Sequence, residues 1–239
     1  MERDFDGPDD FLRWNEEMAH KYDPESYHLR SSPVIRWIER RRVQAILHLL
    51  EAGSEDTVVE VGCGAGIVLS QIQAGTLVGV DLSSFLLNKA ARRLHVHQAT
   101  LVLADAEQLP LPSDRYRKIV CTEVIEHVLH PRRLAKELAR IAAPDATIVI
   151  TIPNEALIER SKGLIQRLGL ARWFLQGASE PDAYHSPGEA NEWHLHHFEL
   201  SLLKEVTAGS LVIQQLRAVP FRFLPLRYVL SFRPVLARK

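Results

Sequence analysis

The sequence predicts an α/β protein in which helices cover both faces of a largely parallel sheet. Short runs rich in β-branched residues alternate along the chain with segments of helical hydrophobic spacing, and turn residues separate them. Such alternation is typical of parallel strands joined by helices. The 239 residues, of which 46% are hydrophobic, suffice for one such domain with additions.

A long amphipathic helix is predicted before the first strand. Apolar residues recur at near-helical spacing between Pro33, which suits a helix start, and Gly53, which suits a helix end. The consecutive arginines Arg40, Arg41 and Arg42 would point in different directions around this helix, so we interpret them as part of a solvated face. Residues 1–53 are therefore expected to form an N-terminal helical extension.

Strands and helices then alternate through the expected domain at residues 54–239. The predicted strands are residues 57–61, 76–81, 100–105, 118–123, 147–152, 210–219 and 227–232. The predicted helices are one that begins near Gly66 and those at residues 83–94, 131–142 and 198–209. Residues 154–198 interrupt the pattern after a strand end, where insertions in open α/β sheets lie over the ligand crevice, and are predicted to cover the substrate.

Composition narrows the classes of function. A formal net charge of -1 argues against a generally basic nucleic-acid binder. The two cysteines, Cys63 and Cys121, cannot form a disulfide framework, and the first residues lack the basic and apolar regions of a secretory signal. No apolar run reaches the length of about 18 residues that a spanning helix needs. We expect a cytoplasmic protein, with peripheral attachment to a membrane left open.

A glycine-rich turn follows the first predicted strand and indicates a cofactor site. Gly62, Gly64 and Gly66 are spaced G-x-G-x-G, whereas the dinucleotide fingerprint is G-x-G-x-x-G. Gly62 would permit the tight turn, Gly64 would let the backbone approach the ligand, and helix-start amides near Gly66 would favour a carboxylate. Such a turn can hold a pyrophosphate or the amino-acid part of S-adenosylmethionine, and the spacing favours the latter.

Carboxylates end the next two predicted strands. Asp81 could accept hydrogen bonds from both ribose hydroxyls in either cofactor class. Asp105 and Ala106 offer a carboxylate for an exocyclic adenine amine and a backbone amide for a ring nitrogen, a pair that dinucleotide folds do not require.

Four segments in order, EVGCGAG, GVD, ADAEQLPLPSD and KIVCTEVIEHV, resemble the class I S-adenosylmethionine-dependent methyltransferases, with the resemblance running from about residue 34 to residue 219. It implies a Rossmann-like, three-layer fold whose seven-stranded sheet has the order 3-2-1-4-5-7-6, with the last strand antiparallel. It further implies that Glu60 orients the loop and the methionine amine, Asp81 holds the ribose, Leu82 lines the adenine pocket, and Asp105 with Ala106 reads adenine.

The segment CTEVIEHVLHP carries candidates for the acceptor site. Glu123, Glu126 and His127 share one face if a helical turn forms there, and His194, in EWHLHHFE, is a further candidate ligand or base. Oxygen and nitrogen ligands suit Mg, Mn, Fe or Zn, and such an ion would activate a substrate hydroxyl. The E-x-x-E-H pattern resembles the O-methyltransferases of ubiquinone biosynthesis and the small-RNA 3'-terminal 2'-O-methyltransferases. Many small-molecule relatives carry a similar stretch without a metal, so that alternative stays open.

The C-terminal part of the chain is basic, since no acidic residue follows Glu205. Aromatic residues alternate there with arginines, which would suit a membrane surface and a lipid-like acceptor, RNA, or merely an exposed basic strand. The near-zero net charge favours a small or lipid-like acceptor over RNA. The alternatives from other classes are an NAD-dependent oxidoreductase and a catalytically silent methyltransferase fold.

Overall fold

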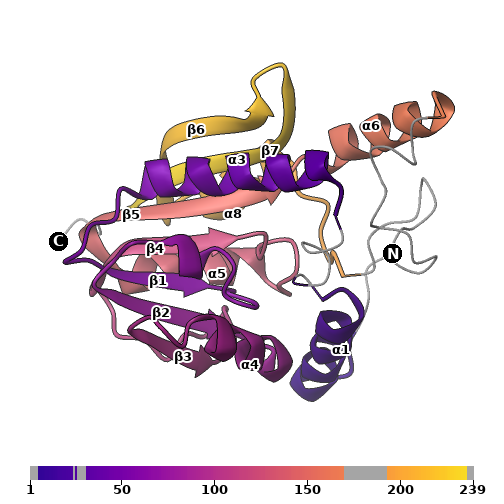
Figure 1. The fold of residues 1–239 in the computed structure, drawn as a ribbon. Helices are drawn as coiled ribbons and strands as arrows, with labels where there is room; N and C mark the ends of the chain where they lie inside the picture. Colours follow the sequence, from indigo (N-terminus) through magenta and orange to yellow (C-terminus); the bar gives the residue numbers. More distant parts are fainter. Residues whose placement is uncertain (1–4, 24, 26–30, 170–192, 236–239) are drawn as a thin grey trace.

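A computed structural model describes residues 5–23, 25, 31–169 and 193–235. Its centre is a seven-stranded sheet in the order β3-β2-β1-β4-β5-β7-β6 (Figure 1). The strands are β1 (Thr57–Val61), β2 (Thr76–Asp81), β3 (Ala99–Leu103), β4 (Tyr116–Thr122), β5 (Ala142–Pro153), β6 (Leu211–Phe221) and β7 (Leu224–Pro234). The helices are α1 (Pro8–Lys21), α3 (Pro33–Leu50), α4 (Ser84–Arg93), α5 (Pro131–Ile141), α6 (Glu155–Arg167) and α8 (Leu200–Thr207).

The strand directions confirm the predicted fold class and sheet order. Strands β1 to β5 pair in parallel with their neighbours, whereas β7 lies antiparallel to both β5 and β6. Because β1 to β5 run in the same direction, their carboxyl ends lie at one edge of the sheet, where ligands of open α/β folds bind. Strands β1 and β4 are neighbours at the centre of the sheet.

Alternate side chains of the strands pack into two apolar cores, one on each face of the sheet. Val59 and Val61 of β1 face a core shared with α5 and α8, while Val58 faces a core shared with α3 and α4. Because both faces of the sheet are buried, the sequences of the central strands are continuous apolar runs. Helix α3, from the expected N-terminal extension, packs into the second core through Val43 and Ile46.

The prediction of a helix that begins near Gly66 is wrong. Between β1 and β2 the chain forms only a turn and a short 3-10 helix at Leu69–Gln71. Ile67 and Val68 are β-branched and disfavour helix, and few residues separate the glycine turn from Gly75 at the start of the next strand. Smaller differences concern boundaries: α3 ends at Leu50 because Glu51 adopts a left-handed conformation, with a φ of 50°.

Two segments outside the sheet border its ligand edge. Helix α1 is fastened to the start of α4, because Glu16 accepts hydrogen bonds from the Ser84 hydroxyl at 2.7 Å and the Phe85 amide at 3.0 Å. Helix α6 opens the predicted cover and contains no buried residue. The rest of that cover from residue 170 to residue 192 lies outside the described residues. Among the described helices, none has the length and apolar character needed to cross a membrane.

Candidate functional site

A pocket of about 290 Å³ opens at the carboxyl ends of β1, β2, β3 and β4. Most of the residues predicted to bind the cofactor line it, together with Glu123 and His127 of the predicted acceptor site. The lining residues from the cofactor set are Glu60, Gly62, Gly64, Asp81, Leu82, Asp105 and Ala106. Short motifs spread over the first half of the chain thus share one cavity.

The glycine turn shapes the floor of this pocket. Gly62 has a φ of 71°, and a Cβ built there would stand 2.1 Å from a methyl carbon of Val124, so no larger residue fits. Gly64 has a φ of 51° and open space beside it, its nearest neighbour lying 4.0 Å away. The backbone at Gly64 can therefore be approached closely by a ligand.

Asp81 holds this turn in place from the end of β2. Its carboxylate accepts hydrogen bonds from the amides of Gly64 at 2.6 Å and Ser83 at 2.9 Å. Burial raises the pKa of Asp81, although these amide bonds favour its ionised form. Asp105 is fixed similarly, by the Glu107 amide at 2.8 Å. Both carboxylates face the pocket from short, hydrogen-bonded loops.

Gly66 differs from its neighbours, because it is not among the residues that line the pocket. A Cβ built there would contact Ala90 and Leu94 near the end of α4 at 3.3 and 3.2 Å. It therefore allows close packing of the turn against α4. Without an α-helix after it, the predicted cluster of helix-start amides for a carboxylate does not form.

The group placed to bind a carboxylate is Arg42, which the sequence interpretation missed. Arg40 and Arg41 are exposed as expected, but Arg42 is buried, lines the pocket and bonds Glu39 at 2.8 Å. Its Nη1 is buried and has no hydrogen-bond partner among the described residues. The signal was present in the helical spacing, since Arg42 stands four residues before the core residue Ile46 and so shares the buried face of α3.

The acidic residue Glu60 lines the same pocket as Arg42. It is 1% exposed and accepts a hydrogen bond from the Thr122 hydroxyl at 3.4 Å, while its Oε2 lacks a partner in the part of the chain that the structure describes. Burial raises the pKa of Glu60 to about 8, against the opposing effect of Arg42. A buried donor on Arg42 and a buried acceptor on Glu60 are complementary to the carboxylate and the amine of an amino acid.

Ion pairs continue from Arg42 toward the predicted acceptor site. Arg227 of β7 lies with its Nη2 3.9 Å from Glu39 and its Nε 3.0 Å from Glu123. Glu123 has a φ of 52°, an uncommon conformation for a residue with a side chain. Thr151 holds it there, accepting from the Glu123 amide at 3.1 Å and donating to its carboxylate at 2.8 Å.

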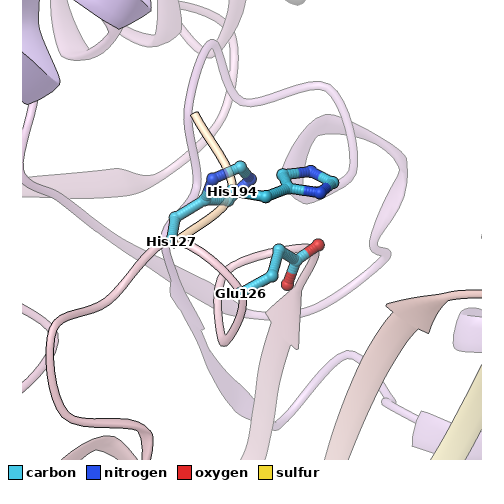
Figure 2. A group of neighbouring side chains, drawn as sticks. All are labelled: Glu126, His127 and His194. Carbon is cyan, nitrogen blue, oxygen red and sulfur yellow. The ribbon is translucent and has the colours of Figure 1, made fainter. Parts of the chain in front are cut away.

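Glu126, His127 and His194 form the one group of potential metal ligands found among the described residues (Figure 2). One ligand atom from each lies within 4.8 Å of the others, although His194 comes from a segment 67 positions later in the chain. Figure 2 shows the three side chains converging. Glu123 was predicted alongside them, but its carboxylate is engaged by Arg227 and Thr151 and does not belong to this group.

Burial shifts the pKa values of Glu126 and His127 in this cluster. Neither carboxylate oxygen of Glu126, which is 0% exposed, has a hydrogen-bond partner within the described ranges. Burial raises the pKa of Glu126 well above its usual value, and Glu123 adds to the effect. Burial and His194 lower the pKa of His127 to about 3, so its imidazole is neutral. A neutral ring donates through Nδ1 to the Trp193 carbonyl oxygen at 2.9 Å, which leaves the Nε2 lone pair available.

The three histidines of the HLHH segment have different partners. His194 Nδ1 lies 2.6 Å from Glu155 at the start of α6, and the exposed His197 contacts the other oxygen of the same carboxylate. His196 Nε2 donates to the Val128 carbonyl oxygen at 2.9 Å, a structural role. Glu155 was not singled out from the sequence, where no motif marks it. It links the predicted cover to the cluster.

Comparison with known proteins agrees with the geometry. Residues 35–211 match a family model described as a methyltransferase domain. The chain is 26% identical over 154 residues to "Ubiquinone biosynthesis O-methyltransferase" of Rhodopseudomonas palustris, a match covering 62% of this chain and 59% of that protein. The chain thus spans less than two thirds of that relative.

Two further comparisons extend over more of the chain. A "Malonyl-[acyl-carrier protein] O-methyltransferase" of Marinomonas is 27% identical over 208 residues, covering 84% of this chain and 68% of that protein. The crystal structure of the N-methyltransferase NodS from Bradyrhizobium japonicum with S-adenosyl-L-homocysteine superposes with a TM-score of 0.61 at 16% identity, over 95% of this chain and 99% of that one. The chain belongs to the class I S-adenosylmethionine-dependent methyltransferases.

Proposed function

We propose that the chain transfers the methyl group of S-adenosylmethionine to a hydroxyl oxygen of a small or lipid-like acceptor. The observation that carries the proposal is the position of His127, which lines the cofactor pocket and also belongs to the buried cluster with Glu126 and His194. Proton-accepting groups therefore border the space in which a methyl acceptor has to lie.

The pocket offers a partner for each part of the cofactor. Arg42 would bind the methionine carboxylate and Glu60 the amine, since each has a buried polar atom without a partner among the described residues. Asp81 would bind the ribose hydroxyls and Asp105 with Ala106 the adenine edge, with Leu82 against the adenine ring. This arrangement would direct the sulfonium methyl toward Glu123 and His127.

The reaction itself requires alignment more than acceleration by strong acids or bases. The acceptor oxygen forms the new O–C bond as the sulfonium C–S bond breaks, S-adenosylhomocysteine leaves, and the hydroxyl proton passes to a base. Holding the two reactants in line accounts for most of the rate. His127, with its Nε2 lone pair available, is placed to take the proton, although its low pKa makes it a weaker base than an exposed histidine.

Glu126, His127 and His194 would also fit a divalent cation such as Mg, Mn or Zn. The fit rests on the two carboxylate oxygens of Glu126, which are buried and lack hydrogen-bond partners among the described residues, and on the neutral ring of His127. When bound, such a cation lowers the pKa of a hydroxyl and orients it. Glu123 is held by Arg227 and would have to leave this ion pair to serve as a ligand.

The relatives named O-methyltransferases support oxygen as the acceptor atom, since their names specify it for two different substrates. The test incubates the protein and methyl-labelled S-adenosylmethionine with a cell extract, with and without a chelator, and measures label in lipid, small-molecule, RNA and protein fractions. We expect label in the lipid or small-molecule fraction, lost in the Glu126→Ala/His127→Ala variant. Label confined to RNA or protein would overturn the proposed acceptor.

A further inference from the structure

The hairpin formed by β6 and β7 projects beside the first half of α3 (Figure 1). Three aromatic side chains from these two elements contact one another near the turn of the hairpin and form an aromatic tip. We define it as Trp37, Phe221 and Phe223. The Phe221 and Phe223 rings are stacked with centroids 5.0 Å apart, and Trp37 lies 5.6 Å from Phe221. Phe223 is 83% exposed, and the other two are about two-fifths exposed. Phenylalanine has no polar atom with which to satisfy water, so this exposure is costly in a purely structural element.

Exposed arginines occur on α3 and on the β6–β7 hairpin, the two elements that carry the aromatic tip. Arg222 lies between the two phenylalanines in the turn, and Arg40 and Arg41 follow Trp37 by one helical turn on α3. Arg36 and Arg217 are exposed on the same two elements. No acidic residue occurs from residue 206 to residue 235, and the acidic residue within α3, Glu39, lines the pocket instead. In the part of the chain that the structure describes, this surface therefore combines exposed aromatic rings with arginines that form no ion pair.

We propose that the aromatic tip docks on an anionic lipid bilayer, with its rings at the acyl boundary and the arginines against lipid phosphates. Aromatic residues and basic side chains on one surface are the combination that binds anionic membrane interfaces. Single-stranded RNA fits less well, because base stacking needs open ring faces, and Phe221 and Phe223 each have one face covered by the other, with an interplanar angle of 6°.

The location connects this surface to the acceptor site. Strand β7 runs from the tip to Arg227, which lines the pocket and bonds Glu123. Arg227 follows Phe223 by four positions, a distance of roughly 13 Å in extended chain. An acceptor held in the outer layer of a bilayer would thus lie near the pocket. This inference deepens the proposed lipid-like acceptor, but its test measures binding without turnover, so either proposal can fail alone.

The test measures co-sedimentation of the full chain with phosphatidylcholine vesicles and with vesicles that also contain phosphatidylglycerol. We expect binding to the anionic vesicles only, weakened by added salt. Arg222→Ala should weaken it about fivefold, and Phe223→Ser together with Phe221→Ser should abolish it. The matched controls, expected to bind as the unmodified chain does, are Val96→Ser, at an exposed apolar residue elsewhere, and Arg133→Ala, at an exposed arginine of α5.

Two results would overturn the proposal. One is equal loss of binding in the control and tip variants, which would indicate non-specific adsorption. The other is the absence of binding to anionic vesicles. Tip-dependent binding of a single-stranded oligoribonucleotide would then assign the aromatic tip to RNA. Circular dichroism of every variant shows whether the fold is retained, and Arg222→Ala, at an exposed turn residue, provides a change that leaves the apolar packing intact.

Discussion

The two ends of the pocket are built in different ways. At the cofactor end, the lining comes largely from one continuous stretch, residues 60–106, whose backbone turns after β1, β2 and β3 set the geometry. At the acceptor end, Glu126 and His127 after β4 group with His194 from before α8. Glu155 of α6 bonds His194, and Arg227 of β7 bonds Glu123. The geometry of the cofactor end is set by local turns between strands of the parallel sheet, whereas the acceptor end depends on how distant segments pack. Changes at the two ends should therefore have separable effects.

The largest effect is expected at the acceptor end. Glu126→Ala combined with His127→Ala should lower turnover by about 10²–10⁴-fold, because it removes the groups that we propose activate the acceptor hydroxyl. Affinity for S-adenosylhomocysteine should change little, since neither residue is assigned to the cofactor. Isothermal titration gives the affinity, and labelled methyl transfer gives the turnover.

A control at the same end sharpens this result. His197 is 78% exposed in its side chain and contacts Glu155, not the cluster, so His197→Ala should retain turnover. Unchanged turnover in the double variant would remove Glu126 and His127 from the chemistry. A loss of cofactor affinity equal to the loss of turnover would show that the two ends are not separable.

At the cofactor end, the expected effect of Gly62→Ala is on stability as well as binding. The added Cβ would meet Val124 at 2.1 Å in a backbone with a φ of 71°. Strain and overpacking together should lower the free energy of unfolding by about 2–5 kcal/mol. Chemical denaturation measures it, and Gly163→Ala in α6, with open space around the glycine, serves as the control. Equal stability of the two variants would refute the argument.

The difference between local turns and the packing of distant segments also explains which features could be predicted from the sequence. Most strand positions followed from local patterns, because parallel strands with buried faces leave continuous apolar runs. The pocket location followed from the ordered motifs, whereas the sheet order followed only from the resemblance to the methyltransferase family. The prediction of a helix near Gly66 failed because β-branched residues disfavour helix there and the connection to the next strand is short. Arg42 was missed because a triplet of arginines looks solvated until its helical phase is compared with Ile46. Glu155 and the His127–His194 contact depend on tertiary packing, which no spacing encodes.

Arg42→Ala tests the amino-acid subsite directly. Loss of a hydrogen-bonded charge partner should weaken S-adenosylhomocysteine binding by about 10–100-fold. Binding of 5'-methylthioadenosine, which lacks the amino-acid carboxylate, should be nearly unchanged. Arg41→Ala, at the exposed neighbour, should affect neither ligand. Equal weakening of both ligands by Arg42→Ala would indicate a general disturbance of the pocket and would contradict the assignment.

The most gradual effect concerns Glu60 in the ligand-free protein, because it is spread over several pH units. Its pKa of about 8 in the folded chain exceeds the usual value of 4.5, so the folded state binds a proton that the unfolded state has released between these two values. The free energy of unfolding contributed by Glu60 should therefore be complete below pH 4.5 and fall as the pH rises toward about 8. Glu60→Gln removes this titration and should flatten the decline by at most about 1.4 kcal/mol per pH unit. Denaturant titrations of Glu60→Gln and of the unmodified chain at matched pH values measure the difference in slope. The control is Gln71→Glu, at an exposed position, whose stability should depend on pH as that of the unmodified chain does. Parallel pH profiles for Glu60→Gln and the unmodified chain would show that Glu60 is already ionised, with Arg42 neutralising it before any cofactor binds.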